Sequence, residues 1–214
     1  CYDPGVLVDE DGRVHLYLGV APGNGPLARL RAGKRIMDGA YHFELEADMR
    51  TLRSEPHRVA PGQELAVGTP YEGHAFFEAS SIRRVGDRYY FIYSSIAGHE
   101  LCYATCDRPD GDFQYGGTLV SIGDIGLDGR TEKDAVNYYG NTHGSIERAG
   151  DRWYVFYHRH TNGNQLSRQG CAEPVTIAPD GSIAQVEVTS CGLNGDWLRD
   201  TGTYSAAIAC NLSS

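Results

Sequence analysis

Three segments of this 214-residue chain follow one pattern, and that repetition restricts the fold more than any other feature. Each has a short run of β-forming residues, a turn that contains glycine and aspartate, and a second run rich in aliphatic and aromatic residues. Glycine and aspartate suit tight hairpin turns because they tolerate positive φ angles. The pattern therefore predicts β-hairpins at residues 6–19, 81–94 and 145–158. Their second strands are apolar on both faces, which is typical of strands packed between neighbouring sheets.

The hairpins recur about 64 to 75 residues apart, which leaves room for two more strands after each one. This spacing indicates the four-stranded blades of a β-propeller, so the predicted fold class is all-β. We expect further strands at 101–105, 175–177 and 183–188, and a loop or short helix at 27–35. An all-β sandwich whose hairpins are similar by chance is the alternative.

Three blades do not close a ring, because propellers have about four to eight. We therefore expect residues 1–214 to form a single partial propeller domain. The N-terminal blades would be missing or would lie on a separate chain.

The charge and the cysteines limit the function classes. The formal net charge is -9, and an acidic chain is repelled by nucleic acid and by anionic membranes. No apolar run is long enough to span a membrane. The six cysteines form no CxxC pair and no zinc pattern, so we expect free thiols in a reducing bacterial cytoplasm rather than the disulfides of a secreted domain.

Two carboxylates and a histidine occupy the same place before the three hairpins. Asp3 precedes the first hairpin, Glu78 the second and His143 the third. The first strands of propeller blades line the central channel, so these side chains are predicted to converge on its axis. Glu78 follows Phe76 and Phe77, and an apolar environment favours a protonated carboxyl group, which suits a general acid. The alternative is that each side chain caps a turn or bonds local amides.

The motifs around these positions resemble those of glycoside hydrolase family 43, five-bladed propeller enzymes that act on arabinan and xylan. They are Asp3-Pro4-Gly5-Val6, Phe77-Glu78-Ala79-Ser80-Ser81-Ile82 and Asn141-Thr142-His143-Gly144-Ser145. They look like the starts of that family's third, fourth and fifth blades, in the same order. The resemblance spans nearly the whole chain and implies that the chain supplies about blades 3 to 5.

The resemblance also implies roles for single residues. Glu78 is where the family keeps its general acid, and Asp3 is where it keeps the aspartate that orients the acid and adjusts its acidity. Arg168 is where an arginine contacts the substrate and that aspartate. We also expect His74 and Phe77 to line the substrate pocket.

A metal ion is implied at the third motif. His143 is where the family's histidine approaches a calcium ion or a water in the channel, and no cofactor is implied for the chemistry itself. The run Asn141-Thr142-His143 departs from the more usual Asn-His-His or Asn-Asn-His. His158 and His160 alternate along one strand face and are predicted to be structural.

The predicted function is the hydrolysis of glycosidic bonds in hemicellulose by an inverting β-xylosidase, an α-L-arabinofuranosidase, or both. Inversion requires a carboxylic acid on one side of the bond and a carboxylate that activates water on the other. The family's general base is an aspartate of the first blade, so we expect an N-terminal fragment of the same precursor to supply it in a heterodimer. A catalytically silent, carbohydrate-binding propeller fragment is the alternative from another class.

The first residue carries a hypothesis of its own. Cys1 lies two residues before Asp3, and a cysteine thiol can attack the preceding carbonyl, forming a thioester that water then cleaves. Self-cleavage of a precursor at Cys1 is one expectation. A truncated sequence is the other.

Overall fold

The computed structural model of the protein describes residues 2–20, 38–194 and 200–203. Cys1 and residues 27–35 lie outside the described residues, so the predictions on them stay predictions. The chain divides into two compact units. The first unit contains residues 1–97 and 102–116, and the second contains residues 98–101 and 117–214.

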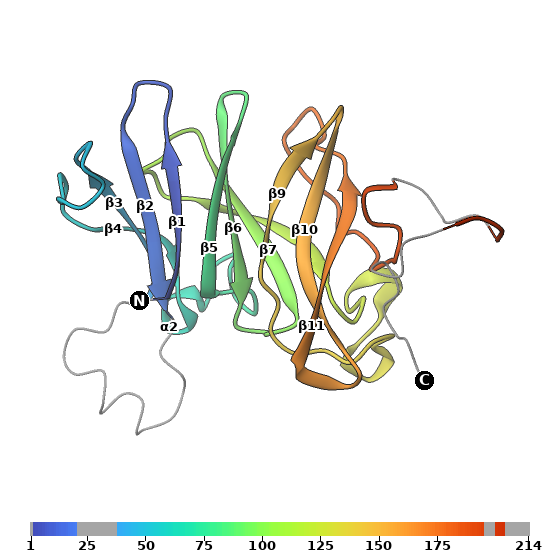
Figure 1. The fold of residues 1–214 in the computed structure, drawn as a ribbon. Helices are drawn as coiled ribbons and strands as arrows, with labels where there is room; N and C mark the ends of the chain where they lie inside the picture. Colours follow the sequence, from blue (N-terminus) through green and yellow to red (C-terminus); the bar gives the residue numbers. More distant parts are fainter. Residues whose placement is uncertain (1, 21–37, 195–199, 204–214) are drawn as a thin grey trace. The chain divides into compact units, whose positions relative to one another are not determined.

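Strands dominate the described residues, and the colours of Figure 1 follow them from the N-terminus to the C-terminus. They are β1 (Tyr2–Val8), β2 (Val14–Val20), β3 (Gly39–Leu45), β4 (His57–Pro61), β5 (Phe76–Val85), β6 (Arg88–Ser95), β7 (Glu100–Cys106), β8 (Gln114–Ser121), β9 (Gly144–Ala149), β10 (Arg152–Thr161) and β11 (Asn164–Val175). The helical elements are short: α2 (Gln63–Ala66), η1 (Leu127–Gly129), η2 (Glu132–Asp134) and η3 (Gly192–Asn194). The all-β prediction is therefore confirmed.

The strands form three sheets with the orders β1-β2-β3-β4, β5-β6-β7-β8 and β11-β10-β9. Each contains one predicted hairpin, namely β1–β2, β5–β6 and β9–β10, and all three pair antiparallel. The turn glycines Gly12, Gly86 and Gly150 have φ angles of 79°, 60° and 65°, a region that favours glycine. The hairpin predictions are thus confirmed, and so is the strand at 101–105, which lies within β7.

The predicted strand at 183–188 is wrong. That segment makes only isolated bridges, Ile177 with Ile183 and Val120 with Val186. Buried carboxylates explain why. The backbone N–H of Val188 donates to Asp124 Oδ1 at 2.8 Å, and the N–H of Thr189 donates to Glu173 Oε1 at 2.8 Å. These amides are therefore bonded to side chains instead of to a neighbouring strand.

Aromatic residues fill the core of the first unit. Phe91 is fully buried, and its ring centroid lies 5.8 Å from that of Tyr17, 6.0 Å from that of Phe76 and 5.8 Å from that of Phe113. These residues come from β2, β5, β6 and the connection that precedes β8. The same cluster buries Ala60 of β4, so one core holds all of these elements together.

A polar cluster ties the β1–β2 turn to the β5–β6 hairpin. The Tyr89 hydroxyl donates to Asp9 Oδ2 at 2.6 Å, and Arg84 donates to Asp9 Oδ1 at 3.1 Å. Burial alone raises the pKa of Asp9, but the hydrogen bonds from Tyr89, the Glu10 amide and Arg84 outweigh it and hold that pKa below 3.8. The ionised carboxylate therefore stabilises the fold above pH 3.8, and this contribution is lost as the pH falls further.

Tyr89→Phe is expected to lower the free energy of unfolding at pH 7 by about 1 to 2 kcal/mol, because a hydrogen bond to a partly buried charge is lost. The difference from wild type should shrink at a pH well below 3.8, because protonation of Asp9 removes the charge that the Tyr89 hydroxyl stabilises. Thermal unfolding at the two pH values measures it, with Tyr138→Phe at an exposed position as the control. Equal melting temperatures at pH 7 would contradict the role of this bond.

No helix among the described residues is long and apolar enough to cross a membrane. The four cysteines that the structure describes are all free thiols: Cys102 and Cys191 are buried, and Cys106 and Cys171 are half-buried. This agrees with the expectation of free thiols.

Candidate active site

β1 and β5 approach each other closely in the first unit, and they lie side by side in Figure 1. A Cβ atom at Gly5 would lie 2.8 Å from the carbonyl oxygen of Ser80 and 3.2 Å from the Cα of Ser81. Both are backbone atoms, which cannot avoid a clash by changing rotamer as a side chain can. Gly5 follows Asp3 by two residues, and Ser80 follows Glu78 by two residues. The glycine contact therefore brings the two candidate catalytic segments together.

Both candidate carboxylates lie at β-bulges. β1 has one extra residue between Tyr2 and Gly5 relative to β2, and β5 has one extra residue on each side of Glu78 relative to β6. Asp3 has a φ of 52°, and Ala79, next to Glu78, has a φ of 68°. Such angles are costly for residues other than glycine and are often found at functional sites. The equivalent positions share the same kind of distortion, which re-aims their side chains.

The sequence predicts an apolar environment for Glu78, but its two aromatic neighbours differ in burial. Glu78 and Phe77 are half-buried, whereas Phe76 is fully buried. The Phe76 ring belongs to the core, with its centroid 5.8 Å from that of Tyr93. Phe77 is thus the neighbouring aromatic side chain with some exposure, and its contact with substrate stays a prediction.

His74 is fixed by packing in the same unit. Its ring stacks on Tyr115 with centroids 5.1 Å apart and planes 16° apart. Its carbonyl oxygen accepts a hydrogen bond from the Tyr93 hydroxyl at 2.8 Å. His74 is half-buried, and its predicted place in the substrate pocket is not tested by these contacts.

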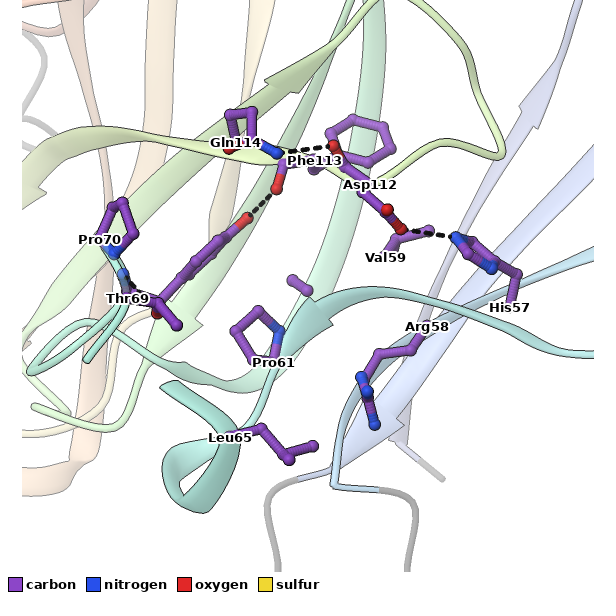
Figure 2. Close-up of a pocket in the computed structure, with 12 residues that line it drawn as sticks. His57, Arg58, Val59, Pro61, Leu65, Thr69, Pro70, Asp112, Phe113 and Gln114 are labelled. Carbon is purple, nitrogen blue, oxygen red and sulfur yellow. Dashed lines mark hydrogen bonds and ion pairs between the residues drawn. The ribbon is translucent and has the colours of Figure 1, made fainter. Parts of the chain in front are cut away.

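A separate pocket of about 710 Å³ lies in the first unit and is not the candidate active site (Figure 2). It is lined by β4, α2 and the connection between β7 and β8, and by neither Asp3 nor Glu78. An ion pair between His57 and Asp112, 2.9 Å long, lies on its wall. Its aromatic residues, such as Tyr71, are nearly fully buried, so they offer no open ring face on which a sugar could stack.

In the second unit, Arg168 belongs to a cluster with His160 and Asn141. Arg168 and His160 are direct partners in the β10–β11 pairing. His160 Nε2 donates to the carbonyl oxygen of Asn141 at 2.8 Å, and Arg168 Nη2 donates to Asn141 Oδ1 at 3.4 Å. Asn141 therefore links Arg168 to the segment before β9. The sequence alone does not predict the hydrogen bond between Arg168 and Asn141, because it joins residues 27 positions apart.

The same segment presents His143 to solvent. The buried Thr142 hydroxyl donates to the carbonyl oxygen of His158 at 2.9 Å, while the next residue, His143, is exposed. Burial lowers the pKa of His158 to about 4, and the positive charge of Arg168 contributes. His158 and His160 contact each other edge to face at 5.6 Å on β10, so they lie together as the alternation predicts.

The residues around His143 only partly suit a calcium ion. Among the described residues, His143 belongs to no group of three His, Cys, Asp or Glu side chains with ligand atoms within 4.8 Å of one another. Calcium prefers six to eight oxygen ligands. These residues therefore assign no step of the chemistry to a metal ion. The predicted convergence of Asp3, Glu78 and His143 also stays a prediction, because His143 lies in the other unit.

Comparison with known proteins places these features in one family. The profile of the family described as "Glycosyl hydrolases family 43" matches residues 1–183. A curated relative from Thermoclostridium stercorarium, named "Xylosidase/arabinosidase", is 47% identical over 212 residues, which are 99% of this chain and 43% of the relative. A second, with the same name and from Bacteroides ovatus, is 31% identical over 73% of this chain and 47% of its own length. The chain thus spans about half the length of these relatives or less.

Solved structures agree. The GH43_1 enzyme from Xanthomonas citri, crystallised with xylose, has a TM-score of 0.64 and 29% identity, and the match covers 86% of this chain and 55% of that one. A family 43 arabinoxylan arabinofuranohydrolase from Bacillus subtilis, crystallised with cellotetraose, has a TM-score of 0.64 at 25% identity, covering 89% of this chain and 38% of that one.

Proposed function

The chain belongs to glycosyl hydrolases family 43, and from that premise we propose that it carries the general acid of an inverting glycosidase, which releases xylose or arabinose units from hemicellulose. The fold is accordingly that of the family's propeller, and we propose that the chain forms a C-terminal part of it. The observation that supports the proposal most is the contact of Gly5 with Ser80, which brings the bulges at Asp3 and Glu78 together. The two curated relatives are named xylosidase/arabinosidase, which supports the substrate class.

In the proposed mechanism Glu78 protonates the glycosidic oxygen as the bond to the leaving group breaks. Asp3 orients Glu78, and its negative charge favours the protonated acid through like-charge repulsion. Arg168, held through Asn141, binds hydroxyl groups of the substrate, and Phe77 and His74 line the pocket. A calcium ion held near His143 through water is part of the proposal as a structural element, with no role in the bond cleavage.

The general base is proposed to come from polypeptide outside these 214 residues. An inverting enzyme needs a second carboxylate, roughly 6.5 to 9.5 Å from the acid, with a water molecule between them. The curated relatives are about twice as long as the region they share with this chain, which leaves room for the missing blades. We propose that an N-terminal fragment completes the propeller and supplies this base.

Hydrolysis assays test the proposed function. The chain, together with the polypeptide that precedes it, is incubated with nitrophenyl β-xyloside and nitrophenyl α-L-arabinofuranoside, and proton NMR follows the anomer released first. Release of the inverted sugar supports the proposal. Binding of xylotriose without any hydrolysis would instead support the carbohydrate-binding alternative.

Asp3→Asn is expected to lower kcat for xylo-oligosaccharides by about 10- to 100-fold. The alkaline limit of the pH–rate profile should also move to lower pH, because the charge that favours protonated Glu78 is gone. Asp87→Asn, in the exposed β5–β6 turn, is the matched control. An unchanged pH profile in Asp3→Asn would remove Asp3 from the site.

A further inference from the structure

An exposed aromatic ring, that of Tyr138, lies in the second unit against the cluster that holds Arg168. Tyr138 is 45% exposed, and its ring meets that of His160 edge to face, with the centroids 5.9 Å apart and the planes at 87°. His160 is directly opposite Arg168 in the β10–β11 pairing, so these two side chains lie on the same face of the sheet. His160 therefore connects the Tyr138 ring to the arginine.

The loop that carries Tyr138 is held by its neighbours in the sequence. The next residue, Tyr139, contacts His99 edge to face with the centroids 5.7 Å apart. Gly140 follows, and a Cβ atom there would lie 2.9 Å from His160 Nε2. The lack of a side chain at Gly140 thus lets the loop approach His160 closely. A ring that is already positioned loses little conformational entropy when a ligand binds.

Polar groups of the same cluster can bind hydroxyl groups. Arg168 is exposed, and two bonds hold it: Nε donates to the carbonyl oxygen of Gln165 at 3.2 Å, and Nη2 donates to Asn141 Oδ1 at 3.4 Å. A guanidinium group has five N–H donors, so three of them have no partner among the described residues. The exposed Gln165 amide lies nearby, since a Cβ atom at Gly140 would be 3.4 Å from its Nε2.

A sugar unit has the chemistry that this combination fits. The C–H groups of a xylose or arabinose ring form an apolar face that can pack on an open aromatic ring. Its hydroxyl oxygens accept hydrogen bonds, which a guanidinium group and an amide can donate. Tyr71, in the large pocket of the first unit, is only 5% exposed, whereas Tyr138 has ring surface open to solvent.

We propose that Tyr138 is a stacking platform for the sugar unit next to the one that Arg168 binds, and that it favours oligosaccharides over single sugars. The inference rests on the proposed function, in which Arg168 contacts the sugar that is released. An enzyme that releases a terminal unit has the rest of the chain on the leaving-group side, so Tyr138 is assigned to that side. Tyr138 contributes affinity for the chain and has no part in proton transfer.

Equilibrium binding of xylotriose and of xylose tests this assignment. Titration calorimetry is carried out on the chain together with the polypeptide that precedes it, with Glu78→Gln in the parent so that xylotriose is not consumed. We expect Tyr138→Ala to weaken xylotriose binding by about 3- to 10-fold, the contribution of one aromatic stacking contact, and to leave xylose binding unchanged. Tyr138→Phe keeps the ring and should bind xylotriose as the parent does. Val136→Ala, at a 52% exposed position of the same loop, is the control and should also match the parent.

The outcomes separate the platform from other roles of Tyr138. Equal xylotriose binding by the parent and by Tyr138→Ala would overturn the proposal, and so would a parent that binds no xylotriose. Equal losses of xylose and xylotriose binding would also overturn it, because Tyr138 would then act only through His160 and Arg168.

The glycosidase function is measured separately, as the release of xylose from xylotriose by the protein with Glu78 intact. A protein that releases no xylose, but whose xylotriose binding still depends on the Tyr138 ring, would refute hydrolysis and support the platform.

Discussion

Glu78→Gln is expected to slow the hydrolysis of natural xylan- and arabinan-type linkages by about 10²- to 10⁴-fold while the protein stays folded. Glutamine has nearly the shape of glutamate but cannot donate a carboxyl proton to the leaving oxygen. Glu78 is half-buried in a bulge of β5, where glutamine fits in its place.

Substrates with different leaving groups separate this effect from simple damage to the site. Nitrophenyl glycosides need little protonation, so Glu78→Gln should slow them far less than xylo-oligosaccharides. Both rates are measured with Glu55→Gln as the control, since Glu55 is an exposed glutamate of the same unit. Wild-type turnover of xylo-oligosaccharides by Glu78→Gln would mean that Glu78 is not the acid.

Gly5→Ala is expected to have the second large effect, on stability and activity together. Its new Cβ atom would lie 2.8 Å from the Ser80 carbonyl oxygen, so β1 and β5 must move apart. Overpacking of this kind costs about 1 to 3 kcal/mol. The separation also displaces Asp3 from Glu78, and a shift of about 1 Å in a catalytic group can lower the rate by about 10²-fold.

Gly170→Ala is the matched control for this substitution. A Cβ atom at Gly170 meets nothing within 4 Å, and its φ lies outside the left-handed region, so neither stability nor activity should change. Denaturant unfolding and kcat/KM for xylo-oligosaccharides are measured for both variants. A Gly5→Ala protein that is destabilised yet fully active would show that the spacing of β1 and β5 does not set the catalytic geometry.

Local patterns were sufficient for much of the fold. The three hairpins are predictable because their signals, alternating β-forming runs around glycine and aspartate turns, lie within about 15 residues of sequence. Asp3, Glu78 and His143 can be identified for the same reason, since each precedes a predicted hairpin run in the sequence, although β1 and β5 begin early enough to include Asp3 and Glu78. The family follows from the short motifs around them.

The tertiary structure decided what depends on contacts between distant residues. The sequence at 183–188 has strand-like residues, but Asp124 binds the amide of Val188 at its end and Glu173 binds the next amide, and this long-range competition has no local signal. The buried pair of His15 and His42 forms only because β2 pairs with β3, which brings two residues 27 positions apart onto neighbouring strands. Gly5 is an ordinary loop glycine in the sequence. The need for glycine at this position is apparent only where the backbones of β1 and β5 meet, because Ser80, 75 residues away, leaves no room for a Cβ atom.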